Sequence, residues 1–216
     1  MNAFRTLIIA ALGFTALPAF ALSDNGQAQL HQLQTRWAEI NYQTPEKQRE
    51  EAFAKLVTQA DAALVSEPKA VELLIWRGII LSTEAGAKGG LGALGLVKEA
   101  KASLEQALVI DPQALAGSAY TSLGSLYYQV PGWPIGFGDD EKAEQMLQQA
   151  LAINPEGLDP NYFYGDYLQR QKRYEESRAA LEKALAAKDR PGRELADKGR
   201  RAEATALLRQ VESKLQ

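Results

Sequence analysis

Residues 86–95, GAKGGLGALG, contain a spacing that is typical of nucleotide chemistry. Gly90, Gly92 and Gly95 match the pattern G-x-G-x-x-G, with which dinucleotide-binding proteins bring a tight turn and a helix N-terminus up to a pyrophosphate. That chemistry requires a strand before the glycines, whereas the sequence before them predicts a helix. Lys88 stands among glycines as in a phosphate-binding loop, but the Gly-Lys-Ser/Thr ending of such loops is missing. We therefore expect an ordinary connection here and no cofactor.

Other residues that could do chemistry also have simpler interpretations. Asp139, Asp140 and Glu141 could bind a metal, but they open a predicted helix, where a side-chain cap and the helix dipole account for them. No second carboxylate cluster accompanies them, so we expect no metal site. The single histidine, His31, lies two residues before the apolar Leu33, and no serine stands in a G-x-S-x-G context. We expect no enzyme active site.

The composition narrows the function classes further. The chain has 216 residues, no cysteine, and 24 basic against 27 acidic side chains. The lack of cysteine excludes a disulfide framework, a thiolate nucleophile, a lipid-modified cysteine and a cysteine-ligated metal. Acidic and basic residues are interleaved along the chain. A nucleic-acid-binding surface or a polybasic membrane-binding patch would instead concentrate basic residues.

The first 21 residues have the order of a secretory signal peptide. Arg5 precedes an apolar run from Leu7 to Leu17, and a small-x-small ending follows at Ala19–Ala21. This run is too short to span a bilayer, and the alternative, a buried N-terminal helix, would end at Pro18. We expect cleavage after Ala21, an exported periplasmic protein without a lipid anchor or stable membrane insertion, and one domain over residues 22–216.

A repeated phrase organises the rest of the chain. It reads AALVSEP at 62–68, QALVIDP at 106–112 and QALAINP at 149–155, with a degenerate copy, KALAAKD, at 183–189. Each of the last three follows a small, large, small pattern at helical spacing: Ala100, Leu104 and Ala107; Ala143, Leu147 and Ala150; Ser177, Leu181 and Ala184.

A second pattern places a glycine in the helix before each of these three. Gly78, Gly124 and Gly165 each have a large residue three positions later, and Gly78 and Gly124 also have one four positions earlier. Small residues at such places let two helices approach closely, so we expect each glycine to lie at a contact between two helices.

Together these marks resemble the tetratricopeptide repeat, a helix-turn-helix unit of about 34 residues. The resemblance implies an all-α solenoid of stacked units, with about nine helices and no sheet. The expected parts are capping helices at 24–66, repeats at about 69–111, 113–155 and 158–189, and a C-terminal capping helix at 193–215.

Two of the units carry insertions between their helices, at 86–95 and at 131–140, PGWPIGFGDD. Stacked units place equivalent turns side by side, so both should lie on one edge. Trp133, Ile135 and Phe137 either pack onto neighbouring helices or form an exposed aromatic knob. We favour a turn that starts the next helix at Asp139 and packs Trp133 and Phe137 onto the array.

The resemblance also implies a concave groove lined by the first helix of each unit. Its apolar, hydroxyl and charged side chains would suit an extended peptide or a small polar ligand. Its inward positions are Ile75, Ile79, Thr83, Thr121, Ser125, Tyr128, Tyr162, Asp166 and Arg170.

The export signal, the repeats and the long inserted turns together resemble the periplasmic tetratricopeptide proteins associated with TRAP-type solute transporters, the T-component group. The leading hypothesis is a non-catalytic exported scaffold that binds a periplasmic protein or peptide through the groove and inserted turns. The alternative is a periplasmic solute-binding component that is associated with a transporter. Neither hypothesis involves nucleic acid.

Overall fold

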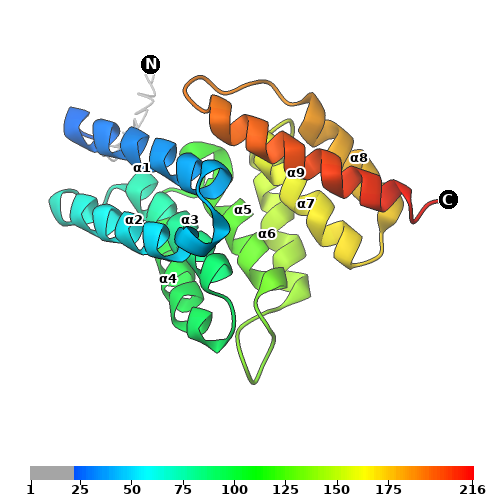
Figure 1. Ribbon diagram of the computed structural model, residues 1–216, viewed down its shortest axis with the longest axis horizontal. Helices are drawn as coiled ribbons and strands as arrows, with labels where there is room; N and C mark the ends of the chain where they lie inside the picture. The colour runs from blue at the N-terminus through cyan, green and yellow to red at the C-terminus, as the bar shows by residue number, and fades with distance from the viewer. Residues whose placement is uncertain (1–21) are drawn as a thin grey trace, which may run out of the picture.

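The computed structural model describes residues 22–216, so the predicted signal peptide lies outside the described residues. These residues form nine α-helices and a short 3-10 helix, with no strand, as the sequence predicted (Figure 1). The helices are α1 (Asp24–Gln43), α2 (Glu46–Ser66), α3 (Val71–Lys88), α4 (Leu94–Ile110), α5 (Ala114–Gln129), α6 (Asp140–Ile153), α7 (Leu158–Arg170), α8 (Tyr174–Ala186) and α9 (Glu194–Glu212).

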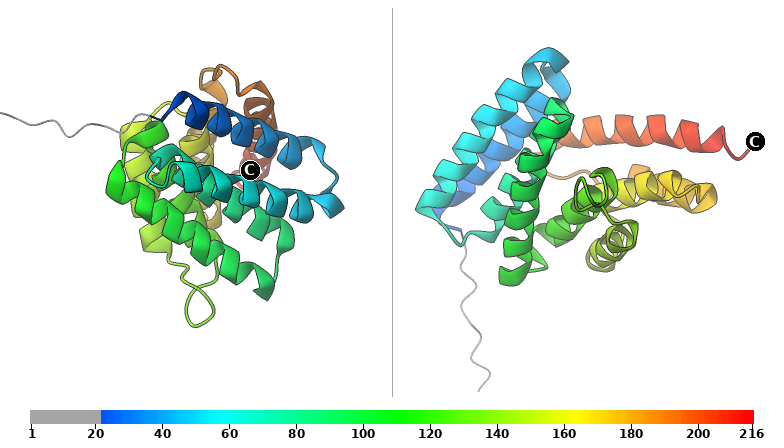
Figure 2. Two further views of the ribbon diagram at one scale, coloured as in Figure 1. Left: turned by 90° about the vertical axis from the view of Figure 1, so that its left-hand side faces the viewer. Right: turned by 90° about the horizontal axis from the view of Figure 1, so that it is seen from below.

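The helices stack as pairs that follow the chain: α1 with α2, α3 with α4, α5 with α6, and α7 with α8 (Figures 1 and 2). The first helix of each pair also packs against the first helix of the next pair. The last helix, α9, packs on α7 and α8 and also touches α1, where Gly199 lies against the ring of Tyr42. The helices α1, α3, α5, α7 and α9 therefore form a closed series of contacts, because α9 returns to α1.

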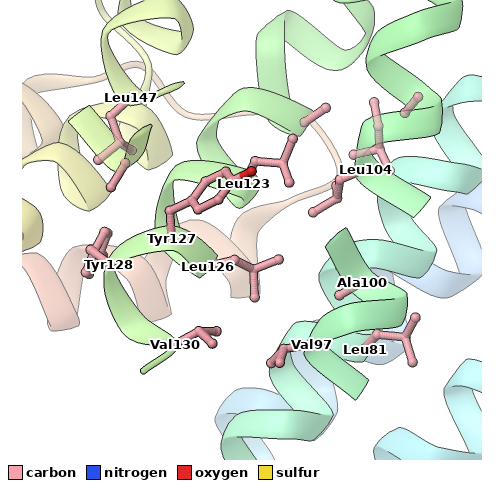
Figure 3. Packing of buried hydrophobic residues seen from close by; sticks show 14 of the residues in the cluster. Leu81, Val97, Ala100, Leu104, Leu123, Leu126, Tyr127, Tyr128, Val130 and Leu147 are labelled. Carbon is pink, nitrogen blue, oxygen red and sulfur yellow. The ribbon is translucent and has the colours of Figure 1, made fainter. Parts of the chain in front are cut away.

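The three predicted glycines do lie at close helix contacts. A Cβ atom placed on Gly78, Gly124 or Gly165 would come within 2.5, 2.6 or 2.7 Å of a leucine Cγ on the partner helix. These leucines are fully buried, and Leu123 lies between two of them (Figure 3). The three leucines are Leu104, Leu147 and Leu181. One close Gly–Leu contact thus joins the two helices in each of the pairs α3–α4, α5–α6 and α7–α8.

The start of α5 departs from a regular helix. Leu115, Ala116 and Gly117 have φ values of 48°, 53° and 76°, a short left-handed stretch that nothing in the sequence pattern predicted. Gly117 packs against Ile153, where a Cβ would come within 3.1 Å of the isoleucine side chain. The Leu115 side chain contacts both of the larger hydrophobic clusters, so the unusual backbone places an apolar group where the two meet.

The end of α7 permits a stability prediction. Lys172 has a φ of 61°, and the N–H of Arg173 donates to the carbonyl of Leu168 at 2.9 Å, as in a Schellman cap. Left-handed backbone costs an L-residue roughly 1–2 kcal/mol, more than the folding entropy of ~0.5–1 kcal/mol that glycine adds. Lys172→Gly should therefore raise the free energy of unfolding by roughly 0.5–1 kcal/mol in urea titrations. The control Lys98→Gly, exposed in α4, should lower it by about 1 kcal/mol.

Candidate functional site

The first four positions of the predicted groove are buried or half-buried. Ile75 is fully buried in the core, Thr121 is buried and Ile79 is half-buried. The Thr83 hydroxyl accepts a hydrogen bond from the indole N–H of Trp37 at 2.9 Å, which ties α1 to α3. These four positions therefore support the packing of the first helices.

Four predicted groove residues come together at the C-terminal ends of α5 and α7. The Tyr128 hydroxyl donates to Asp166 Oδ2 at 2.8 Å, and the Arg170 guanidinium lies 5.0 Å from the Tyr128 ring centroid. Gln129 Nε2 donates to Ser125 Oγ at 3.0 Å and to the Tyr128 hydroxyl at 3.2 Å. We call these five residues the α5–α7 patch. Gln129 was not among the predicted groove residues, although it lies one helical turn after Ser125 in the same helix.

The electrostatics of this patch hold Tyr128 in its neutral form. Burial raises the pKa of the Tyr128 phenol well above 10, and the nearby Asp166 carboxylate raises it further. Arg170 is the accessible member, with 49% of its side chain exposed, and its Nε lies 3.5 Å from Asp166 Oδ2. The patch can therefore offer a fixed guanidinium and a carboxylate to a polar partner.

Tyr162 belongs to a different group of residues. The Arg200 guanidinium covers its ring at 4.5 Å and the ring of Phe163 at 4.6 Å, both measured to the centroids. Arg200 comes from α9, so the C-terminal helix occupies this part of the predicted groove.

Arg200 is part of a network of ion pairs that the sequence analysis missed. Asp159 of α7 accepts from Arg190 at 2.6 Å and from Arg200 at 2.9 Å, and Arg190 also pairs with Asp197 at 2.5 Å. Burial alone would raise the pKa of Asp159, but the guanidinium groups of Arg200 and Arg190 outweigh it and lower that pKa to about 2. The network joins α7, α9 and the connection before α9.

The insertion at 131–140 forms a hairpin that confirms two expectations and corrects a third. Asp139 caps α6 by accepting from the N–H of Lys142 at 3.1 Å, and Phe137 packs edge-on against Tyr127 with ring centroids 5.7 Å apart. Trp133 does not pack as predicted: it is 90% exposed, and Ile135 is 54% exposed.

The backbone explains the exposure of Trp133. The N–H of Gly138 donates to the carbonyl of Pro131 at 3.0 Å, and the N–H of Asp139 donates to the carbonyl of Tyr127 at 2.8 Å. These bonds hold the hairpin without help from the Trp133 side chain. The hairpin therefore presents its tip to solvent, and we call it the aromatic hairpin.

The insertion at 86–95 lies on the same edge of the array as this hairpin (Figure 1). A helix, α3, precedes its glycines, and Gly89 and Gly90 adopt φ values of 64° and 61° in the turn before α4. Leu91 at this turn is 78% exposed, and Lys88 pairs with Glu50 at 2.7 Å. The strand that dinucleotide binding needs is therefore replaced by a helix.

The surface also has two shallow depressions outside the predicted groove. One of about 370 Å³ lies along α1 and α2, and one of about 290 Å³ lies among α2, α3 and α4. Within residues 22–216, no three His, Cys, Asp or Glu side chains are grouped so that they could hold a metal ion. None of the helices over the same range has the length and apolar character needed to cross a membrane.

A comparison with protein-family models finds a match to part of this array of helix pairs. Residues 135–194, which include α6, α7 and α8, match the family model of the tetratricopeptide repeat. The fold is thus a TPR-like helical-repeat array. No curated protein sequence matches the chain.

Several solved structures are similar to this chain. A crystal structure of MamA is 24% identical, covers 78% of this chain and 92% of its own, and has a TM-score of 0.45. A second crystal structure of MamA protein is 22% identical, covers 87% and 92%, and has a TM-score of 0.44. TTC0263, a thermophilic TPR protein of Thermus thermophilus, is 18% identical, covers 84% and 99%, and has a TM-score of 0.43.

Proposed function

We propose that the protein is a non-catalytic scaffold that binds an extended segment of another protein at the α5–α7 patch and the aromatic hairpin. Arrays of helical repeats present extended surfaces that bind other proteins. The observation that carries the proposal is the position of Arg170, whose guanidinium is stacked on Tyr128 while half of its side chain faces solvent. A cation held in this way loses less freedom when a partner binds.

The patch and the hairpin complement each other chemically. An extended peptide presents N–H and C=O groups, which the carboxylate of Asp166 and the donors of Arg170 and Gln129 can satisfy. The hairpin begins two residues after Gln129 and supplies the exposed indole of Trp133 as an apolar anchor. Tryptophan and arginine are enriched among the residues that dominate binding energy at protein interfaces.

We also propose that the protein acts outside the cytoplasm, on a periplasmic partner. This proposal is supported by the order of residues 1–21, in which one basic residue, an apolar run and a small-x-small ending follow one another. Association with a solute transporter is a narrower form of the same proposal, supported by the resemblance to the T-component group.

The proposal predicts which arginine matters for partner binding. Native mass spectrometry of the protein, extracted gently from its own host, would first identify a bound partner. Arg170→Ala should then weaken the affinity for that partner at least tenfold, because it removes the exposed donors of the patch. The matched control is Arg178→Ala, since Arg178 also pairs with a carboxylate within its own helix and is similarly exposed, at 43%, but lies on α8. Equal affinities of the two variants would contradict the proposal.

A further inference from the structure

The two halves of α9 are held in different ways. Its C-terminal half packs on α7 and α8, where Ala204 and Val211 form a cluster with Leu181. Its N-terminal half reaches the first helices instead, where Leu195 and Ala196 join the cluster around Trp37 and Trp76. Figure 2 (right) shows the N-terminal end of α9 against these helices and its C-terminal end running away from them.

The start of α9 contacts α1 and α3 through apolar packing and through the stacking of Arg193 on Trp76. Across residues 22–216, no hydrogen bond or ion pair joins residues 192–200 to either helix. Two glycines also lie at this contact: Gly199 lies against the Tyr42 ring, and Gly192 lies near His31. The apolar part of the contact comes from Leu195 and Ala196, so the hydrophobic stabilisation lost on separation is that of these two side chains and of the cluster they pack against.

Two polar atoms at the same contact are buried without a partner. The Tyr42 hydroxyl and Arg193 Nε both lack a hydrogen bond, although the Arg193 guanidinium stacks 4.9 Å from the ring centroid of Trp76. Leaving such a group unsatisfied costs about 1–3 kcal/mol. Burial, with help from the neighbouring Arg190, also lowers the pKa of Arg193. Both atoms would regain water if the contact opened.

We propose that residues 192–200 form a latch, which opens away from α1 and α3 while the rest of the fold stays intact. The side of the latch that faces α7 stays anchored, because Arg200 pairs there with Asp159. Opening uncovers the inner face of α1 and α3, where Trp37, Trp76 and the predicted groove residue Thr83 lie. That this opening regulates partner access rests on the proposed function, whereas the opening itself does not.

Cysteine labelling can test the latch directly, because the chain has no cysteine of its own. Ala196→Cys places a thiol on the buried face of the latch, and the matched control Ala204→Cys places one on the same helix beneath α8; both alanines are buried. With the thiol reagent DTNB in native buffer, we expect Ala196→Cys to react at least 100-fold faster than Ala204→Cys. The labelling rate of Ala196→Cys should also depend less on the urea concentration. Equal rates with equal urea dependence would overturn the proposal.

Two further substitutions in the Ala196→Cys background shift the latch in opposite directions. Tyr42→Phe removes the unsatisfied hydroxyl and should slow labelling about fivefold, whereas Gly199→Ala pushes a methyl group into the Tyr42 ring and should speed labelling. Effects of the opposite sign, or no effect, would contradict the latch. None of these measurements requires a binding partner, so they can refute the latch without bearing on the proposed function.

Discussion

Asp159→Asn should lower the free energy of unfolding by about 3 kcal/mol at pH 7. Asp159 accepts from both Arg190 and Arg200, and the Arg200 side chain is only 12% exposed. Removing one member of a buried ion pair typically costs about 3–5 kcal/mol, because the remaining charge is buried without compensation. The Asp159 side chain is 29% exposed, which places the expected loss at the lower end. Urea titrations of both proteins measure it.

The same carboxylate predicts how the difference changes with pH. The pKa of Asp159 is lowered from 3.8 to about 2 in the folded protein, so the folded state binds the proton less tightly than the unfolded state. Its stabilising contribution is complete above the unfolded pKa and is lost as the pH falls from about 4 towards 2. The gap between wild type and Asp159→Asn should therefore be constant from pH 7 to 5 and should narrow below pH 4.

Asp61→Asn is the matched control for this substitution. Asp61 pairs with Arg77 at 2.5 Å, but its side chain is 49% exposed. Exposed ion pairs contribute about 0–1 kcal/mol, so this variant should unfold almost like the wild type. If both asparagine variants lost the same stability, the network around Asp159 would not be the anchor of α9 that the geometry indicates.

The close helix contacts were predictable because each depends on residues near one another in the sequence. Gly124 and Leu147 lie in consecutive helices of one unit, and the spacing of small and large residues marks both. Asp139 was predictable for the same reason, since a cap is satisfied by the N–H of Lys142, three residues away. The Gly–Leu pattern also recurs at Gly78 and Gly165, and this recurrence makes it visible in the sequence.

The network around Asp159 was not predictable, because its members do not recur. Arg190 and Arg200 lie 31 and 41 residues after Asp159, outside the repeat marks. They meet only because α9 turns back across the first helices. The same closure explains the position of Tyr162: the repeat pattern identifies it as facing the groove, but not that Arg200 covers it.

Trp133 shows a different limit of sequence reasoning. A long loop in a compact protein usually needs its own small core, which favoured packing for Trp133 and Phe137 alike. The two differ in the structure because backbone hydrogen bonds hold the hairpin by themselves, and only Phe137 lies near its base, beside Tyr127. Whether a side chain at a loop tip turns inward depends on loop geometry, which composition does not reveal.

Gly124→Val should lower the free energy of unfolding by about 3 kcal/mol, the upper end of overpacking effects. A Cβ at this position would lie 2.6 Å from Leu147 Cγ and 3.2 Å from the carbonyl oxygen of Ala143, and a helix backbone cannot yield easily. Gly86 is the control, because a Cβ there meets no atom within 4 Å. Gly86→Val should be neutral or stabilising by a few tenths of a kcal/mol, since valine has the higher helix propensity.

A double-mutant cycle separates this steric conflict from other effects of losing the glycine. Leu147→Ala alone should cost about 2–5 kcal/mol, because it leaves a cavity in the core. In that background the space next to Gly124 is open, so Gly124→Ala should change from destabilising to neutral or stabilising by up to about 1 kcal/mol. If Gly124→Ala destabilised both backgrounds equally, the glycine would be required for some reason other than its contact with Leu147. A change of sign would instead show that one leucine in each unit sets the distance between its helices, which explains why the pattern recurs at Gly78 and Gly165.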